Sequence, residues 1–223
     1  MGIRTGRNWG KPKSRIAVFE NSINTHYIQI MNKIKKLIDT NYGTSRGLVR
    51  SALGQLDYLS GRIDPFLNPR MESVERVVFV CLGNINRSAF AEAAASALGV
   101  KTCSIGLSTT TGHPAFEKAI TTADSLGFDL TAHSATNLTD YQFRPNDLLL
   151  AMEIRHAYRL RDAKIPIESI ALLGHWSAPH RIHLHDPHTL SDAYFRTCFN
   201  LLRSAVEGLV EDLKSAKSPS LLP

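Results

Sequence analysis

The chain has 223 residues, 43% of them hydrophobic, which is enough to build one well-packed α/β domain and a smaller attachment. No stretch approaches the roughly 18 consecutive apolar residues that a membrane span needs, and no apolar run follows the basic start as in a secretory signal. Three cysteines are too few for a disulfide framework, and their odd number favours a reducing, cytoplasmic setting.

The net charge of +6 is concentrated in the first third of the chain. Residues 1–72 hold 12 Lys and Arg against 5 Asp and Glu, whereas residues 73–223 hold 14 against 15. Two interpretations stay open. The basic segment either meets an acidic partner or an anionic surface, or it is a solubilising face. We do not expect nucleic acid as a main partner.

Two helices are expected ahead of the main domain. Residues 1–15 are rich in Gly, Lys and Arg without an apolar period, which predicts a disordered arm. Apolar residues then recur at intervals of three and four over residues 27–38 and 48–59, and residues 41–45 supply a break and a cap. This pattern predicts a helical hairpin and linker over residues 16–72. Because such a hairpin cannot bury both stripes alone, it should dock on the main domain, on a second copy or on another partner.

From residue 76 the pattern changes to strands that alternate with helices. Short buried-strand patterns occur at Val77–Val80, Thr102–Leu107, Leu148–Met152 and Ser169–Leu173, and helical patterns at Ser88–Leu98, Ala115–Leu126, Glu153–Arg161 and Ser191–Leu213. The alternation predicts an α/β domain over residues 73–214, with a doubly wound, four-stranded parallel sheet flanked by helices, and a flexible tail over residues 215–223. Ligands of such sheets bind at the carboxyl ends of the strands.

The segment from Cys81 to Ser88 connects the first of these strands to the following helix. Gly83 permits a turn that directs several backbone N–H groups inward, and Ser88 can cap the helix. Converging N–H groups and the helix dipole form a site for a tetrahedral dianion, to which Arg87 adds a planar fork of donors. The same positive surroundings favour the thiolate form of Cys81. We therefore expect a nucleophilic cysteine in a phosphate-binding loop made of Leu82, Gly83, Asn84, Ile85, Asn86, Arg87 and Ser88.

A Cys, five residues and an Arg-Ser pair at the end of the first strand resemble the loop of the low-molecular-weight protein tyrosine phosphatases. The resemblance covers about residues 75–213 and continues, in order, at Ser104–Leu107, Gly112–Ala115, His133–Ala135, Ala151–Glu153 and His185–Pro187. It implies a flavodoxin-like strand order, a protein phosphotyrosine substrate and no cofactor. The N-terminal helices have no counterpart in this resemblance.

The resemblance also implies roles for individual residues. Cys81 attacks phosphorus and forms a cysteinyl-phosphate, while Arg87 and the loop amides stabilise the transition state. Asp186 protonates the leaving phenolate and then activates water. The implied hydrogen-bond network that holds the loop consists of Asn84, Ser88, Ser104 and His133.

The chain departs from the family pattern at several positions. Asn86 stands where a second Cys is frequent, Ala89 replaces the usual Pro, and His188 and Thr189 follow Asp186-Pro187 in place of aromatic residues. Ile85 favours phosphotyrosine, because arginine-phosphatase relatives place Thr there. These departures leave catalytic efficiency and substrate preference open.

Two other functions stay open as well. Thiol-dependent arsenate reduction uses a similar fold and loop but needs resolving cysteines, and we expect Cys103 and Cys198 in the core. The third possibility is a catalytically weak phosphate-binding interaction protein. The segment His180–His188 holds four His and one Asp that could ligate a metal, but solvated or substrate-facing histidines are expected there, so no metal is predicted.

Overall fold

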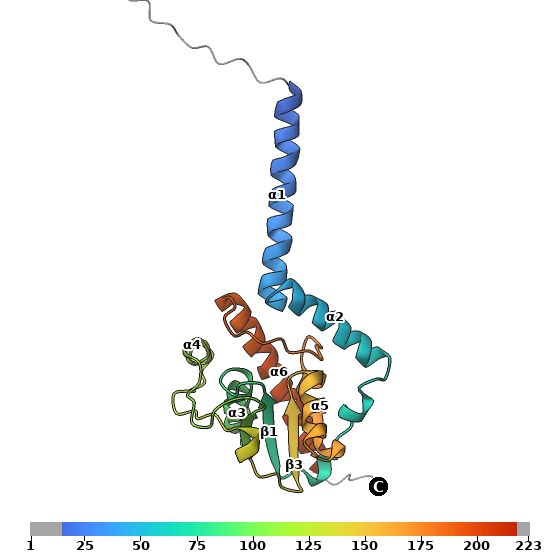
Figure 1. Ribbon diagram of the computed structural model, residues 1–223, viewed down its shortest axis with the longest axis vertical. Coiled ribbons are helices and arrows are strands. Elements are labelled where there is room, and N and C mark those ends of the chain that lie inside the picture. Colours follow the sequence, from blue (N-terminus) through green and yellow to red (C-terminus); the bar gives the residue numbers. More distant parts are fainter. Residues whose placement is uncertain (1–14, 218–223) are drawn as a thin grey trace, which may run out of the picture. The chain divides into compact units, whose positions relative to one another are not determined.

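The computed structural model describes residues 15–217, so the predicted arm over residues 1–15 lies almost entirely outside the described residues. The chain divides into two compact units, the first ending at Leu37 and the second starting at Ile38. Most of helix α1 (Arg15–Tyr42) belongs to the first unit (Figure 1). The second unit holds the last turn of α1, the helix α2 and the whole sheet.

A four-stranded parallel sheet forms the centre of the second unit. Its strands are β1 (Arg76–Cys81), β2 (Thr102–Gly106), β3 (Asp147–Ala151) and β4 (Ile170–Leu172), in the order β2-β1-β3-β4. This confirms the predicted fold class and strand order. In the register, Cys81 pairs with Gly106 and Val80 pairs with Ala151. The carboxyl ends of the three neighbouring strands therefore lie together, and a site at this edge can draw residues from each.

Helices cover both faces of the sheet (Figure 1). Val77 and Phe79 belong to one apolar cluster with α3 (Arg87–Ala97), α4 (Glu117–Asp124) and α6 (Asp192–Lys217). Val78 and Val80 belong to a second cluster with α5 (Ile154–Asp162) and with Ile63 and Phe66 of the linker. Because successive side chains of a strand point to opposite faces, burial on both faces requires the continuous apolar run seen in β1.

The end of α6 differs from the prediction. A flexible tail was expected from residue 215, whereas α6 continues through Lys217. Val210 and Leu213 are still buried in the core one turn before this end, which extends the helix. Lys214 and Lys217 in the last turn also suit the negative end of the helix dipole.

The junction between the two N-terminal helices lies where the sequence predicts it. Helix α1 ends at Tyr42, and Gly43 has a φ of 76°, a left-handed conformation that glycine adopts readily. Thr44 caps α2 (Ser45–Leu59), its Oγ1 accepting a hydrogen bond from the N–H of Gly47 at 2.9 Å. Two N-terminal helices are thus present, while their antiparallel pairing remains a prediction.

Helix α2 packs on the domain through its small residues. Gly47, Ser51 and Gly54 are its buried residues, spaced at four and three. Its large apolar side chains Val49, Leu53, Leu56 and Leu59 are each more than half exposed, so the predicted apolar stripe does not face the domain. Among residues 15–217, no helix combines the length and the hydropathy that a membrane span requires.

Candidate active site

The loop between β1 and α3 folds around the sulfur of Cys81. The backbone N–H of Asn84 donates to Cys81 Sγ at 3.2 Å, and Ser88 Oγ in the first turn of α3 lies 3.0 Å from the same atom. Asn84 has a φ of 53°, a left-handed conformation that turns the backbone back toward the sulfur. The sulfur therefore lies at the N-terminal end of α3, where the helix dipole favours negative charge.

The side chain of Asn84 is the centre of a buried hydrogen-bond network. Its Nδ2 donates to Ser88 Oγ at 2.9 Å and to Ser104 Oγ at 2.7 Å, and its Oδ1 accepts from the N–H of Thr136 at 2.8 Å. The ring Nε2 of His133 lies 2.7 Å from the carbonyl oxygen of Asn84. The structure thus brings together all four residues predicted to support the loop. Because every polar atom of the Asn84 amide is bonded, these contacts stabilise the unusual backbone conformation.

Glu92 extends this network and was not predicted. Ser104 Oγ donates to Glu92 Oε2 at 2.6 Å, and Nδ1 of His133 lies 4.0 Å from the same oxygen. Glu92 lies on α3, which begins directly after the loop. The carboxylate therefore connects β2 and the His133 segment to the helix that follows the phosphate-binding loop.

Arg87 is fully buried and bonded on both arms of its guanidinium. Nη1 donates to Glu153 Oε1 at 2.7 Å and to the carbonyl oxygen of Leu184 at 2.8 Å. Nη2 donates to Asp186 Oδ2 at 2.8 Å. Nε is buried and has no hydrogen-bond partner within the described part of the chain. A buried donor without a partner is costly, and an anion bound in the loop would satisfy it.

The charges around Arg87 favour the ion-paired form. Burial alone would lower the pKa of Arg87, but Asp186 and Glu153 raise it above its ordinary value. Burial alone would raise the pKa of Glu153, but the charge of Arg87 and the hydrogen bond from Arg155 hold it well below its ordinary value. Burial lowers the pKa of the adjacent His156 to about 3, so this ring is neutral. Glu153 therefore fixes the orientation of the arginine, a function that was not predicted for this residue.

Asp186 lies next to the loop through its contact with Arg87. Its Oδ2 accepts from Arg87, and its Oδ1 accepts from the N–H of His188 at 3.2 Å. The side chain is 32% exposed, so one side of the carboxylate remains open to solvent. Cys81, Arg87 and Asp186 thus meet at one edge of the sheet, although Asp186 follows Cys81 by more than 100 residues.

Two rings line the same side of the loop. The ring centroids of Phe116 and His188 lie 4.7 Å apart in an edge-to-face arrangement. Nδ1 of His188 lies 3.4 Å from Nδ2 of Asn86, and the N–H of Phe116 donates to the carbonyl oxygen of Ile85 at 2.9 Å. Phe116 was not predicted, and it supplies the aromatic surface that the sequence lacks after Asp186-Pro187.

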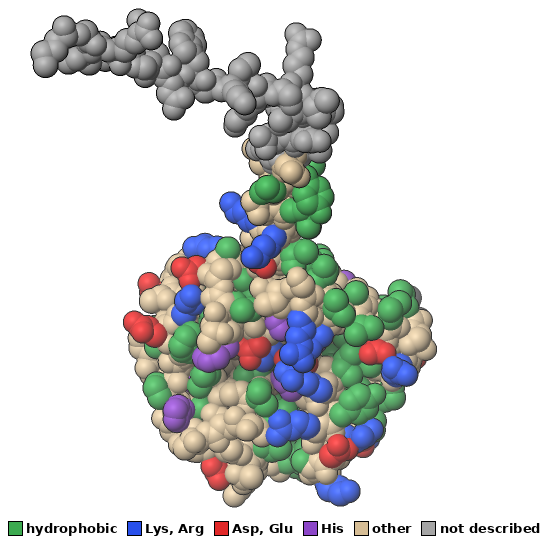
Figure 2. All heavy atoms as spheres, turned by 45° about the horizontal axis from the view of Figure 1, so that its top comes forward, with side chains coloured by type: hydrophobic (Ala, Val, Ile, Leu, Met, Phe, Trp, Pro, Cys, Tyr) green, Lys and Arg blue, Asp and Glu red, His purple; other side chains and the backbone are tan. Residues whose placement is uncertain are grey.

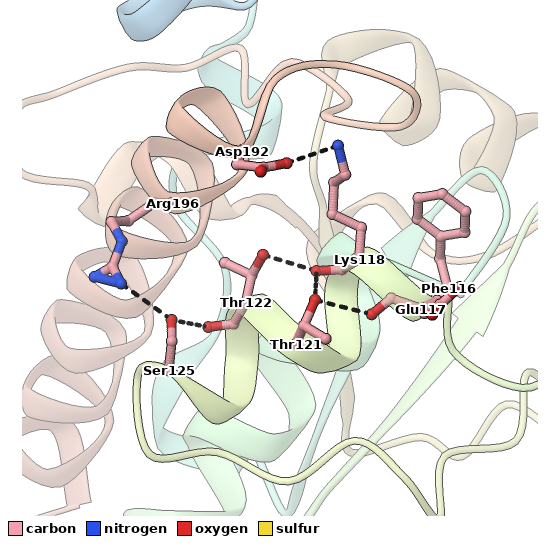
Figure 3. Close-up of a pocket in the computed structure, with 8 residues that line it drawn as sticks. All are labelled: Phe116, Glu117, Lys118, Thr121, Thr122, Ser125, Asp192 and Arg196. Atoms are coloured by element: carbon pink, nitrogen blue, oxygen red, sulfur yellow. Dashed lines mark hydrogen bonds and ion pairs between the residues drawn. The ribbon is translucent and has the colours of Figure 1, made fainter.

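A pocket of about 460 Å³, with Phe116 among its lining residues, lies between α4 and the start of α6 (Figure 3). Lys118 Nζ pairs with Asp192 Oδ1 at 2.7 Å, and Nη2 of Arg196 donates to Ser125 Oγ at 3.2 Å. Of the charged groups in this pocket, Lys118 and Asp192 are paired with each other and Arg196 is bonded to a serine hydroxyl. It contains none of the predicted site residues, so we do not assign the phosphate site to it.

Of the four histidines in the segment His180–His188, His183 is buried, His180 and His185 are half-buried and His188 is exposed. His183 is 9% exposed, and burial lowers its pKa to about 4. His185 is half-buried with its ring centroid 5.8 Å from that of His183. Of the two expectations for these histidines, solvated or substrate-facing, the first is wrong for His183, which is buried against Gly54 of α2. Within residues 15–217, no group of three or more His, Cys, Asp or Glu side chains has the geometry of a metal site.

A cysteine at the carboxyl end of a central strand, with a loop folded over its sulfur and a buried arginine behind it, is the arrangement of a cysteine-dependent phosphatase. The chain belongs to the low molecular weight phosphotyrosine protein phosphatase family, whose model matches residues 76–218. It is thus a protein tyrosine phosphatase of the cysteine-dependent, low-molecular-weight type. Helices α1 and α2 precede the matched region.

Individual relatives agree with this family. The low molecular weight protein-tyrosine-phosphatase Wzb of Salmonella typhi is 32% identical over 134 residues, which cover 58% of this chain and 89% of Wzb. The crystal structure of the tyrosine phosphatase AmsI of Erwinia amylovora superposes with a TM-score of 0.57 at 32% identity, covering 62% of this chain and 93% of AmsI. The structure of Wzb from Escherichia coli K30, solved in complex with sulphate, superposes with a TM-score of 0.56 at 30% identity. The alignment covers 63% of this chain and 99% of that structure.

Proposed function

We propose that this protein hydrolyses phosphotyrosine in protein substrates through a cysteinyl-phosphate intermediate, with Cys81 as nucleophile. One observation carries the proposal: the loop N–H of Asn84 and the hydroxyl of Ser88 both lie against Cys81 Sγ, beside a fully buried Arg87. A sulfur held at a helix N-terminus is stabilised as thiolate, the nucleophilic form.

In the first step the Cys81 thiolate attacks phosphorus. The S–P bond forms as the bond from phosphorus to the tyrosine oxygen breaks, and Asp186 gives its proton to the leaving oxygen. The unpaired Nε of Arg87 and the N–H groups of the loop (residues 82–88) supply donors to the phosphoryl oxygens, whose charge grows in the transition state.

In the second step water attacks phosphorus and the Asp186 carboxylate takes its proton. The S–P bond breaks, and inorganic phosphate and the Cys81 thiolate are formed. The Ser88 hydroxyl, 3.0 Å from Sγ, can donate to the departing sulfur and stabilise its charge. The Asn84 network keeps that hydroxyl in place.

The test is an assay of phosphotyrosine, phosphoserine and phosphoarginine peptides with the full-length protein. We expect hydrolysis of the phosphotyrosine peptide, at least about 1,000-fold slower in Cys81→Ser, whose hydroxyl ionises far less readily than a thiol. Cys103→Ser is the matched control and should keep the activity. A fully active Cys81→Ser would disprove the mechanism. Phosphate binding without turnover by the wild type would instead support an interaction protein.

No observation favours arsenate reduction. Burial raises the pKa of Cys198 to about 12 and also raises the pKa of Cys103. Both groups are therefore thiols at neutral pH, and thiols are poor partners in a disulfide relay. Consumption of thiols that depends on arsenate and on Cys198 would reverse this conclusion.

We further propose that a second copy of the chain associates through α1, within the basic extension of residues 16–72. Tyr27, Ile30, Ile34 and Leu37 are exposed apolar residues at intervals of three, four and three. This is the heptad spacing of a coiled coil, which is complementary to itself. Figure 2 also shows hydrophobic side chains gathered on the surface, among them the exposed face of α2.

Sedimentation of the full-length protein tests this association. We expect a dimer for the wild type and a monomer for the double variant Ile30→Lys, Ile34→Lys. The double variant Gln29→Lys, Asn32→Lys adds the same two charges to exposed positions of the same helix outside these intervals and should leave the dimer intact. A monomeric wild type at micromolar concentration would contradict self-association and favour a different protein partner.

We place the enzyme in the cytoplasm. Cys81, Cys103 and Cys198 are all free in the structure. A catalytic thiolate survives best in a reducing compartment, where glutathione and thioredoxin keep thiols reduced.

A further inference from the structure

Helix α2 lies against the segment that leads into Asp186. Nε2 of Gln55 donates to the carbonyl oxygen of His180 at 3.3 Å and lies 3.2 Å from its ring Nδ1. The guanidinium of Arg181 lies 4.4 Å from the ring centroid of Tyr42 and donates to the carbonyl oxygen of Asn41. The extension therefore holds this segment at residues 180 and 181, a few positions before the proposed general acid.

The contact is closest at His185, the residue before Asp186. Thr44 Oγ1 lies 3.5 Å from His185 Nε2, and Gly47 faces the His185 ring so closely that an added Cβ would come within 2.8 Å of Cδ2. On the other side, the hydroxyl of Tyr194 on α6 donates to the carbonyl oxygen of His185 at 3.2 Å. His185 is thus held between α2 and α6.

We propose that α2 is a positioning element for Asp186, acting through His185, and this inference rests on the proposed phosphatase function. A general acid must lie within hydrogen-bond reach of the leaving oxygen, and a displacement of 1 Å costs on the order of a hundredfold in rate. Because the family match begins at residue 76, the helix that performs this function lies outside the matched domain.

Glycine is required at the closest point of this contact. A Cβ on Gly47 would also lie 2.0 Å from the carbonyl oxygen of Tyr42, so alanine there must displace the start of α2 or the His185 ring. At Gly54, on the same buried face, an added Cβ would lie 3.4 Å from the nearest atom, Cβ of His183, which is an ordinary contact. The two glycines therefore provide a pair of identical substitutions on the same buried face of one helix, of which only the first meets a close neighbour.

The experiment compares Gly47→Ala and Gly54→Ala in the full-length protein with two substrates. The phenolate that leaves from phenyl phosphate is about as basic as that of tyrosine, so its departure requires protonation by the general acid. The p-nitrophenolate that leaves from p-nitrophenyl phosphate is a much weaker base, so its departure requires little help from the acid. For Gly47→Ala we expect kcat/KM to fall about tenfold to a hundredfold with phenyl phosphate and less than about threefold with p-nitrophenyl phosphate. Gly54→Ala should match the wild type on both.

Inhibition by inorganic phosphate separates positioning from a general structural effect. It should not weaken in Gly47→Ala, because the substitution displaces Asp186, a competitor of phosphate for Arg87, and leaves the donors of the loop in place. An equal loss with both substrates together with weakened phosphate inhibition would mean that α2 supports the fold only, and would overturn the proposal. Activity equal to the wild type on both substrates would overturn it as well.

Thr44→Ala keeps the inference testable if Gly47→Ala does not fold. It removes the oxygen beside His185 Nε2 and the cap of α2 without adding bulk. We expect kcat/KM with phenyl phosphate to fall at least about threefold more than kcat/KM with p-nitrophenyl phosphate. An equal fall with the two substrates would contradict the proposal. If the wild type hydrolyses neither substrate or Cys81→Ser stays active, the phosphatase mechanism itself is wrong. If the wild type is active and Cys81→Ser is inactive, but the α2 variants show no selective loss with phenyl phosphate, the phosphatase mechanism stands and only the proposed positioning by α2 is wrong.

Discussion

Nη2 of Arg87 donates to Oδ2 of Asp186 at 2.8 Å, which joins the start of α3 to the segment before α6. A phosphoryl group bound by a guanidinium engages two of its donors, so a phosphate entering the loop competes with Asp186 for Nη2. The proposed acid and the proposed phosphate-binding residue therefore do not act independently.

Replacing Asp186 by Asn should separate catalysis from binding. We expect kcat/KM for a phosphotyrosine peptide to fall about 100- to 1,000-fold, because the proton donor is lost. Inorganic phosphate should bind several-fold more tightly, because a negative charge and a competitor for Arg87 are removed. Inhibition constants for phosphate measure the second effect. Asp192→Asn, at an exposed carboxylate that pairs with Lys118, should change neither value. Weaker phosphate binding in Asp186→Asn would contradict the competition.

Arg87→Lys tests whether the several hydrogen bonds of the buried Arg87 guanidinium are required. A lysine ammonium cannot bond Glu153, Leu184 and Asp186 and still offer a donor at the position of Nε. We expect turnover to fall at least about 100-fold and the free energy of unfolding to fall by about 2 kcal/mol. Urea denaturation measures the second value. Arg155→Lys, whose half-exposed side chain also contacts Glu153, should cost less than about 1 kcal/mol and leave turnover intact.

Asn84 offers a test of the network that does not remove a reacting group. Asn84→Gly keeps the left-handed backbone accessible but removes the amide bonded to Ser88, Ser104 and the N–H of Thr136. We expect kcat/KM to fall about tenfold in Asn84→Gly. Asn84→Ala should show the same loss and about 1 kcal/mol of additional destabilisation from its φ. Wild-type activity in the glycine variant would show that only the backbone conformation matters.

The strands, the helices and the loop could be predicted from local patterns. The apolar run before Cys81 and the Ala-rich segment after Ser88 define β1 and α3, and both depend only on neighbouring residues. Glu153 could not be assigned its function in this way. Its contact with Arg87 depends on β3 lying next to β1, which places the residue after β3 beside the loop after β1. The family resemblance at Ala151–Glu153 includes Glu153, but it does not indicate that this carboxylate pairs with Arg87.

The packing of α2 shows the limit of periodicity. The stripe containing Leu53 and Leu56 predicts the buried face of an amphipathic helix, yet the structure buries Gly47 and Gly54. Close approach to His183 and His185 requires small residues, and this need arises from tertiary structure alone. The sequence therefore predicted the helix but not the face that meets the domain.

Buried histidines should make the protein sensitive to mild acid. The pKa values of His156 and His183 are lowered to about 3 and about 4 in the folded protein, against about 6.5 in an unfolded chain. Burial also lowers the pKa values of three other histidines, His175, His180 and His185. In this range the unfolded chain therefore binds at least two more protons than the native state, and stability falls as the pH falls from about 7 to 4. The lowered pKa of Glu153 extends the loss below about pH 4.3.

Urea midpoints at pH 7, 6 and 5 measure this dependence. His156→Leu removes one of these groups, so the slope of unfolding free energy against pH should fall by about one proton. His156→Leu with an unchanged slope would contradict the assignment of this ring as a neutral buried group.

The neighbours of the Cys81 sulfur also determine how the enzyme responds to peroxide. Asn84 and Ser88 touch the sulfur, and the next side chain of the loop beyond Ile85 is the amide of Asn86, which faces His188. A sulfenic acid formed at Cys81 therefore meets hydroxyl and amide groups in its own loop, where a second thiol could have captured it as a disulfide. Recovery from oxidative stress then depends on small thiols supplied by the cell, and prolonged exposure converts the enzyme to irreversibly oxidised forms.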